Sequence, residues 1–252
     1  MQYVISDSDR VFEDMHYTGA RSALEIHPDG KPYHTFRTAT VLVTGKDLTF
    51  RRCSFANTAG PGKTAAQAIA LYLDGDGIRL EDCVLEGHQD TLFLAPLPPK
   101  EIQKDGFLGP GQFTPRTDRT VYFKNCRIEG GVDFIFGGAA AYFDGCVFVS
   151  NEPGYVFAPS TPEHVKTGFV ARNCRFERTG DVPDASCYLA RPWREYGKVR
   201  LEDCFLDAHI CPEGFHDWNK PRAHETALFE EYRSFGPGAK RARRPSWVRF
   251  EA

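Results

Sequence analysis

The chain has 252 residues, of which 41% are hydrophobic and 26% charged, with a formal net charge of −3 and a pI near 6.2. A chain of this size can bury a substantial core, and its slightly acidic balance argues against nucleic acid as a partner. No apolar stretch approaches the roughly 20 residues that a membrane span needs.

A short pattern recurs six times: apolar, any, apolar, any, any, Cys, any, apolar. Its copies read LTFRRCSF, IRLEDCVL, VYFKNCRI, AYFDGCVF, FVARNCRF and VRLEDCFL, around Cys53, Cys83, Cys126, Cys146, Cys174 and Cys204. Apolar residues alternate with other residues before and after the two variable positions that precede the cysteine. This alternation predicts two short strands joined by a tight corner. Most corners place Asp, Asn or Gly before the cysteine, residues that tolerate left-handed backbone angles. The cysteines then point inward as small apolar residues, which predicts a buried ladder of free thiols.

A second set of strand-like runs lies between these corner units. The runs are QAIALYL from Gln67, QDTLF from Gln89, DFIF from Asp133, YVFA from Tyr155 and CYLARPW from Cys187. One run and one corner unit make one coil, and coils stacked with strands about 4.8 Å apart make a parallel β-helix. The prediction is an all-β, right-handed parallel β-helix that forms a single domain over residues 1–252.

The C-terminal part of the chain departs from the repeat. Helical periodicity is scarce, and one helix is predicted around HETALFEEY, from His224 to Tyr232. The basic residues that follow lie in a tail rich in Pro and Gly, and are predicted to form a solvated surface. They are Lys240, Arg241, Arg243 and Arg244.

Two aspartates share one position in the repeat, because Asp90 follows Cys83 at the same offset at which Asp133 follows Cys126. On neighbouring coils the two carboxylates would lie close together, and like charges push pKa values apart and leave one acid and one base or nucleophile. Arg191 would favour a charged Asp133 if it lies nearer to it, which leaves Asp90 as the acid. The repeat also brings Gln67 and Gln89 to the same sheet face.

The segments QAIAL, GHQDTLF, GGVDFIFG and YLARPW resemble the signature segments of pectin methylesterases, and the resemblance runs from about Phe36 to the C-terminus. That family is built on a right-handed parallel β-helix and uses no metal or other cofactor. It removes methyl groups from esterified galacturonate. The resemblance therefore implies methyl-esterified pectin or oligogalacturonate as the partner.

The resemblance also implies a role for each matching residue. Asp133 would attack the ester carbonyl, giving an acyl-enzyme and releasing methanol. Asp90 would protonate the departing methoxide and then activate water. Gln67 and Gln89 would stabilise the oxyanion. Arg191 would keep Asp133 ionised and oriented.

Further features carry over or depart from the family pattern. Trp193 and Phe136 resemble aromatics that contact the sugar. The stretch from Leu94 to Asp118 resembles a loop of bacterial members that overhangs the cleft, which predicts a preference for short oligosaccharides. Gly131 stands where Thr is common in the family, and Ala190 where Gly is common.

Each site residue also has a structural interpretation. The aspartates could bond to corner amides, and the glutamines could form an amide ladder between coils. Arg191 could belong to a surface ion pair, and Trp193 and Phe136 could be core aromatics. No metal site is predicted, because the chain has no CxxC pair and His88 stands alone beside Asp90.

Two alternative functions stay open on the residues alone. A β-helix glycoside hydrolase could use the same two aspartates, since carboxylates about 5 Å apart suit a retaining mechanism. A non-catalytic carbohydrate-binding repeat is the other alternative. A β-helix lyase would require a calcium-binding acidic cluster, which the sequence does not show.

The N-terminal segment leads to two further expectations. Compared with the family pattern, the chain is expected to start late and to lack the usual N-terminal capping coils, and Val4, Ile5, Val11 and Phe12 would provide little apolar cover. An uncovered coil exposes strand edges, which predicts self-association through the N-terminal end, or reduced stability relative to a version with an added N-terminal coil. MQYVISDSDR has no signal-peptide pattern, so the protein is expected to be cytoplasmic as written, or secreted if the N-terminus has been trimmed.

Overall fold

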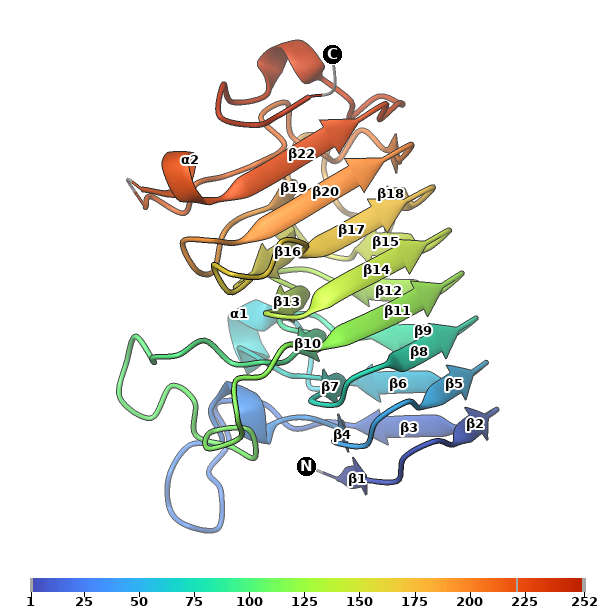
Figure 1. Ribbon diagram of the computed structural model, residues 1–252, viewed down its shortest axis with the longest axis vertical. Coiled ribbons are helices and arrows are strands. Elements are labelled where there is room, and N and C mark those ends of the chain that lie inside the picture. The colour runs from blue at the N-terminus through green and yellow to red at the C-terminus, as the bar shows by residue number, and fades with distance from the viewer. Residues whose placement is uncertain (1, 221, 251–252) are drawn as a thin grey trace.

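The strands of the computed structural model stack into three parallel sheets, and each coil up to β21 contributes one strand to each sheet, while β22 extends one sheet alone (Figure 1). The structure describes residues 2–220 and 222–250, so residues 1, 221, 251 and 252 of the predicted domain lie outside the described residues. The architecture is the predicted right-handed parallel β-helix. Within it, no helix among the described residues is long and apolar enough to cross a membrane.

The three sheets are named here A, B and C. Sheet A consists of β1 (Tyr3–Ile5), β4 (Val41–Val43), β7 (Leu71–Leu73), β10 (Leu92–Leu94), β13 (Ile135–Gly137), β16 (Tyr155–Pro159) and β19 (Tyr188–Ala190). Sheet B consists of β2 (Val11–Glu13), β5 (Thr49–Arg51), β8 (Ile78–Glu81), β11 (Thr120–Lys124), β14 (Ala140–Asp144), β17 (Phe169–Arg172), β20 (Lys198–Glu202) and β22 (Leu228–Tyr232). Sheet C consists of β3 (His16–Gly19), β6 (Ser54–Asn57), β9 (Val84–Glu86), β12 (Arg127–Gly130), β15 (Val147–Ser150), β18 (Arg175–Arg178) and β21 (Phe205–Leu206).

Short helical turns interrupt the connections between strands. They are the 3₁₀ turn η1 (Thr35–Arg37), the helices α1 (Gly62–Ala65) and α2 (Ala223–Thr226), and the 3₁₀ turn η2 (Arg241–Arg243). The second set of runs predicted from the sequence supplies the strands of sheet A from β7 to β19. Each corner unit supplies one strand of sheet B and the next strand of sheet C.

The corner residue between sheets B and C has a left-handed backbone in every repeat, as the sequence predicts. The φ angles are 51° at Arg52, 53° at Asp82, 52° at Asn125, 63° at Gly145, 54° at Asn173 and 54° at Asp203. Arg52 is the exception in residue type, and its guanidinium bonds to the carboxylate of the preceding corner residue, Asp14, at 2.8 Å. Corner side chains therefore bond from coil to coil on the outside of the turn.

The repeat cysteines form the predicted ladder inside the corner. All six are at most 1% exposed, and every cysteine of the described chain is a free thiol. The Cys126 thiol donates to the carbonyl oxygen of Leu80 in the coil before it, at 3.4 Å. A hydrogen bond to the Cys126 thiol and burial both raise the pKa of Cys83. The thiols are thus small, neutral core groups.

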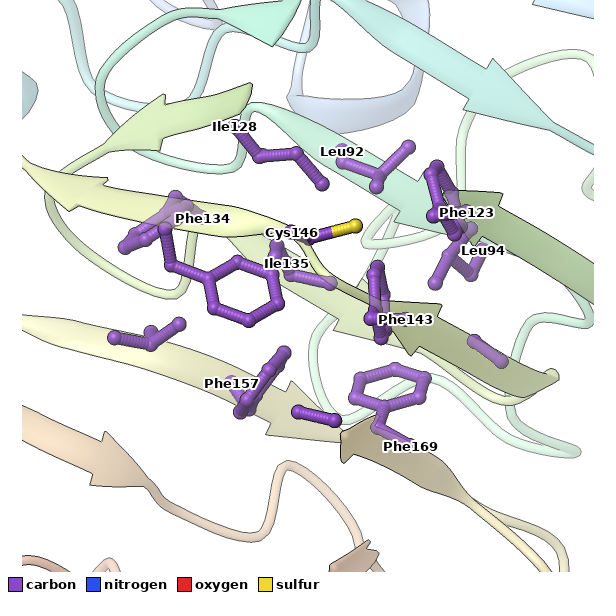
Figure 2. Packing of buried hydrophobic residues seen from close by; sticks show 14 of the residues in the cluster. Leu92, Leu94, Phe123, Ile128, Phe134, Ile135, Phe143, Cys146, Phe157 and Phe169 are labelled. Carbon is purple, nitrogen blue, oxygen red and sulfur yellow. The ribbon is translucent and has the colours of Figure 1, made fainter. Parts of the chain in front are cut away.

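The register of sheet A decides what faces inward and what faces out. Leu92 pairs with Ile135, which pairs with Phe157, and all three side chains are buried inside the β-helix (Figure 2). Successive side chains of a strand alternate between faces, so Phe93 and Phe136 point outward. They join a second apolar cluster on the outer face of sheet A, which supports the functional site.

The predicted helix from His224 to Tyr232 is wrong beyond its first turn. Helix α2 ends at Thr226, and Leu228–Tyr232 is strand β22, which pairs in parallel with β20. The sequence LFEEY also alternates, and pairing with the edge of sheet B buries Phe229 completely. Tertiary pairing therefore overrides the local helical pattern.

The basic tail residues divide into two groups. Lys240, Arg241 and Arg243 are exposed, as predicted, but the prediction is wrong for Arg244, which is buried. Its guanidinium donates to Glu231 Oε2 at 2.7 Å and to Glu231 Oε1 at 3.2 Å. A buried guanidinium needs such a partner, because an unpaired charge away from water is costly.

Candidate active site

A cavity of about 300 Å³ opens on the outer face of sheet A, on the side of the long loop between β10 and β11. It brings together all the site residues that the sequence predicts, namely Gln67, Gln89, Asp90, Asp133, Phe136, Arg191 and Trp193. The cavity is completed by Thr35, Phe36, Ile102, Gln103, Gly106, Phe107, Ala158, Arg194 and Trp218.

The two aspartates occupy equivalent places just before β10 and β13. The N–H of Asp90 donates to the carbonyl oxygen of Val132 at 3.1 Å, and Leu92 pairs with Ile135, so Asp90 lies beside Asp133 on the next coil. Both have left-handed backbones, with φ of 65° and 50°. Such conformations are uncommon outside glycine and often occur at functional sites.

Asp133 is held by Arg191 through two parallel hydrogen bonds. The Nε–Oδ1 distance is 2.7 Å and the Nη2–Oδ2 distance is 2.6 Å. The guanidinium carbon in turn lies 3.8 Å from the ring centroid of Tyr155 and 3.7 Å from that of Trp218. Two aromatic rings and one carboxylate therefore fix the orientation of the guanidinium.

The surroundings of Asp90 and Asp133 shift the pKa values of the two carboxyl groups by different amounts. Burial raises the pKa of Asp90 well above its usual range, and repulsion from Asp133 raises it further. Burial also raises the pKa of Asp133, but the hydrogen bonds and positive charge of Arg191 oppose that rise. Asp133 therefore ionises first, and Asp90 keeps its proton to higher pH.

The two glutamine side chains are available to a ligand. Both are partly exposed and line the cavity, and their backbones are adjacent because Ala68 N–H donates to the carbonyl oxygen of Gln89 at 3.1 Å. Between residues 2 and 250, leaving out 221, the structure shows no hydrogen bond from either side-chain amide to another group of the chain. This argues against the structural amide ladder.

The two predicted aromatics differ in their surroundings. Phe136 is only 3% exposed and packs against Phe93, with ring centroids 4.8 Å apart, so it is largely a core residue that also lines the cavity. Trp193 is half-buried and packs across Phe136 at 5.6 Å. Trp193 therefore presents the larger aromatic surface to the cavity.

Sequence reasoning missed two residues beside the site, Trp218 and Lys220. Trp218 stacks on Arg191, and the ammonium of Lys220 donates to the carbonyl oxygen of Trp193 at 2.9 Å. Burial and the neighbouring arginines lower the pKa of Lys220 to about 8. Both residues lie in an irregular loop between β21 and α2, where the repeat register gives no signal.

In the part of the chain that the structure describes, no group of three or more His, Cys, Asp or Glu side chains is placed to hold a metal ion. His88 lies outside the cavity lining, with its Nδ1 atom 3.7 Å from Glu152 Oε1.

Fold and site together define a parallel β-helix protein with a paired-carboxylate site on its sheet A face. A model of the pectinesterase family matches residues 19–96 and 115–252, so the chain belongs to the pectinesterase family. This confirms the resemblance seen in the sequence motifs.

Individual relatives agree with this placement. The chain is 32% identical over 243 residues to probable pectinesterase/pectinesterase inhibitor 12 of Arabidopsis thaliana, covering 92% of this chain and 39% of that protein. It is 32% identical over 228 residues to a pectinesterase of Petunia integrifolia, covering 86% of this chain and 54% of the relative. The chain therefore spans about two fifths to just over half the length of these relatives.

Solved structures show the same fold. Pectin methylesterase from carrot aligns with a TM-score of 0.78 at 25% identity, and pectin methylesterase PemA from Erwinia chrysanthemi with a TM-score of 0.76 at 25% identity. Both alignments cover 100% of this chain and 80% of the other.

Proposed function

We propose that this protein is an esterase that removes methyl groups from esterified galacturonate in pectin or its oligosaccharides. The observation that carries the proposal is the asymmetry of two buried, adjacent aspartates, of which only Asp133 has a guanidinium partner. Membership of the pectinesterase family supports the choice of substrate.

The first half of the reaction follows from the ionisation states. The Asp133 carboxylate attacks the ester carbonyl carbon, and the carbonyl electron pair moves onto oxygen. The amides of Gln67 and Gln89 donate hydrogen bonds to this oxyanion. When the tetrahedral intermediate collapses, the bond to methoxide breaks and the proton of Asp90 passes to it. Methanol leaves, and an anhydride joins the substrate to Asp133.

The second half reverses the roles. Asp90, now ionised, takes a proton from a water molecule as the water attacks the acyl carbon. The bond to Asp133 breaks, the galacturonate product is free, and Asp90 carries its proton again. Arg191 stabilises the Asp133 carboxylate as nucleophile in the first half and as leaving group in the second.

The surroundings of the cavity suggest how a sugar is held. Trp193 and the edge of Phe136 provide an apolar surface for the C–H face of a galacturonate ring. Ile102 and Phe107 from the 94–118 loop also line the cavity, and the Phe107 ring packs against Trp193 with centroids 6.4 Å apart; this cover over the cavity supports a preference for short oligosaccharides over long polymers.

The experiment that tests this function measures methanol and reducing ends together. Incubation with methyl-esterified trigalacturonate should release methanol without new reducing ends. New reducing ends would instead support the glycoside hydrolase, and binding without either product would support the carbohydrate-binding repeat.

Self-association through the N-terminal end stays a prediction. In the coil formed by β1, β2 and β3, Val4 is 59% and Val11 54% exposed, whereas Ile5 is buried. Light scattering across a concentration series tests it, and an unchanged monomer mass would contradict it.

A further inference from the structure

Glu152 lies in the turn between β15 and β16, close to the site but outside the lining of its cavity. Its backbone is fixed to the preceding coil on both sides. The N–H of Asn151 donates to the carbonyl oxygen of Gly130 at 2.9 Å. The N–H of Tyr155 donates to that of Gly131 at 3.1 Å. The Glu152 side chain is only 16% exposed, so a largely buried carboxyl group is held on a fixed backbone beside the site.

The Glu152 side chain reaches segments of two earlier coils. Its Oε1 atom accepts a hydrogen bond from the N–H of Gly62 at 3.3 Å and lies 3.7 Å from His88 Nδ1. Gly62 is the first residue of α1, so its N–H has no partner within that helix. Within residues 2–220 and 222–250, the buried Nδ1 atom of His88 has no hydrogen-bond partner, so it does not compete with Gly62 for this oxygen.

Gly131 leaves the space that the Glu152 side chain occupies. A β-carbon placed at Gly131 would lie 2.0 Å from Glu152 Cγ and 2.5 Å from Glu152 Oε1. Both distances are far shorter than a favourable contact between carbon atoms, which is about 3.5–4.0 Å. The backbone of Gly131 is not left-handed, so its conformation does not itself require glycine. The packing of Glu152 therefore explains why no side chain stands at this position.

Both contacts of Glu152 lie next to Gln89. A β-carbon placed at Gly62 would lie 2.8 Å from Gln89 Oε1 and 3.1 Å from Gln89 Cβ, so the Gln89 side chain packs directly on the Gly62 backbone. His88 immediately precedes Gln89 in the chain. In the described part of the chain the Gln89 amide has no hydrogen-bond partner, so its position depends on the groups against which it packs. Glu152 holds one of these groups, the Gly62 backbone, in place.

We propose that Glu152 is a positioning residue of the esterase reaction, which keeps Gln89 in place as an oxyanion donor by fixing Gly62 against it. The inference rests on the proposed function. A donor stabilises the oxyanion only within hydrogen-bond distance, and a misplacement of about 1 Å can cost roughly a hundredfold in rate. Glu152 itself does not line the cavity, so its loss lowers kcat and leaves KM unchanged.

The first test compares two substitutions that differ in one acceptor atom. Glu152→Met keeps the length of the side chain and removes the oxygen that binds Gly62, whereas Glu152→Gln keeps an acceptor oxygen. Glu152→Met should lower kcat by roughly tenfold or more with KM within about twofold, and Glu152→Gln should stay within about threefold of the unmodified kcat. Glu152→Asp, which is one methylene shorter, should behave like Glu152→Met. Equal kcat values in Glu152→Met and Glu152→Gln would overturn the proposal.

Glu202→Met serves as the matched control for this comparison. Glu202 is 13% exposed and pairs with Arg172 on sheet B, at a distance of 2.7 Å between Arg172 Nε and Glu202 Oε2. Its replacement should leave kcat unchanged. The second test adds Glu152→Met to Gln89→Ala. The double variant should have the kcat of Gln89→Ala alone, because the donor that Glu152 holds is already absent. A further loss of roughly tenfold would show that Glu152 acts through another group, and would overturn the proposal.

Amide hydrogen exchange, followed by NMR, measures the Gly62 contact without turnover. The Gly62 amide should exchange roughly tenfold faster in Glu152→Met than in the unmodified protein, and should stay protected in Glu152→Gln. Equal exchange in Glu152→Met and the unmodified protein would overturn the proposal. If the unmodified protein releases no methanol from methyl-esterified trigalacturonate, the esterase function fails, while the exchange measurement still decides whether Glu152 holds Gly62.

Discussion

The guanidinium of Arg191 and the carboxylate of Asp133 face each other in a bidentate pair, 2.7 Å and 2.6 Å apart, while Asp90 on the neighbouring coil has no such partner. The same repeat position thus holds two chemically different carboxyl groups. The difference comes from a residue two strands further along sheet A, since Arg191 directly follows β19.

Replacing Arg191 by lysine tests whether the hydrogen-bond geometry of its guanidinium matters in addition to its charge. Arg191→Lys keeps a positive charge but loses the parallel hydrogen bonds and the stacking between Tyr155 and Trp218. We expect kcat to fall by roughly a hundredfold, the usual effect of a misplaced reacting group. Steady-state methanol release measures this, with Arg172→Lys as the control. A kcat equal to that of the unmodified protein would show that the pair does not orient Asp133.

The amides should matter for turnover more than for folding. Gln67→Ala and Gln89→Ala should each lower kcat by roughly a hundredfold or more, because each removes one donor to the oxyanion. Melting temperatures should barely change, since neither amide bonds to another group of the chain within residues 2–220 and 222–250. Near-normal kcat combined with earlier melting would instead establish the amide ladder.

The raised pKa of Asp90 also predicts a pH-dependent stability change. The folded protein holds this proton more tightly than the unfolded chain, so the group contributes stability below about pH 4 that is lost as pH rises through the folded pKa. At pH 7 the unfolded chain can ionise Asp90 freely, whereas the folded protein disfavours the ionised form, so Asp90 costs stability there. Asp90→Asn removes the ionisable group and should raise Tm at pH 7 by roughly 2–4 °C or more, the effect of about 1 kcal/mol. The gain should disappear near pH 4.

Asp203→Asn is a matched control for that experiment, because Asp203 also has a left-handed backbone, with φ of 54°. Its hydrogen bond to Arg233 lowers the pKa of the Asp203 carboxyl, which is the opposite of the shift at Asp90. Asp203→Asn is therefore not expected to raise Tm at pH 7. Calorimetric melting of both variants from pH 4 to pH 8 makes the comparison. A lower Tm for Asp90→Asn at pH 7 would contradict the raised pKa.

The buried cysteine ladder predicts a sharp contrast in thiol reactivity. Cys53, Cys83, Cys126, Cys146, Cys174 and Cys204 should resist a thiol reagent in the native protein and react fully after denaturation. Mass spectrometry of the labelled protein counts them. Disulfides among these cysteines would refute the ladder.

Much of the fold could be predicted because the repeat is encoded locally. Each corner residue and each inward cysteine can be read from one coil, and the coils then stack in the only register that buries them. The register places Asp90 beside Asp133 without further information. Gln67 and Gln89 follow from the same argument.

The remaining features depend on partners that local patterns do not specify. HETALFEEY satisfies both helical and alternating patterns, and the free edge of β20 selects the strand. Arg244 looks like one of a solvated cluster until β22 brings Glu231 to it. Trp218 reaches Arg191 from an irregular loop, so no repeat position predicts the contact.

Methanol release by the unmodified protein and by Asp133→Asn, measured side by side on methyl-esterified trigalacturonate, tests the central claim most directly. The substitution keeps the shape of the side chain and removes the nucleophile's charge. We predict steady methanol release by the unmodified protein and a rate at least roughly a thousandfold lower in the variant, which should retain its β-sheet circular dichroism. A folded Asp133→Asn variant that hydrolyses the ester at the unmodified rate would contradict the account.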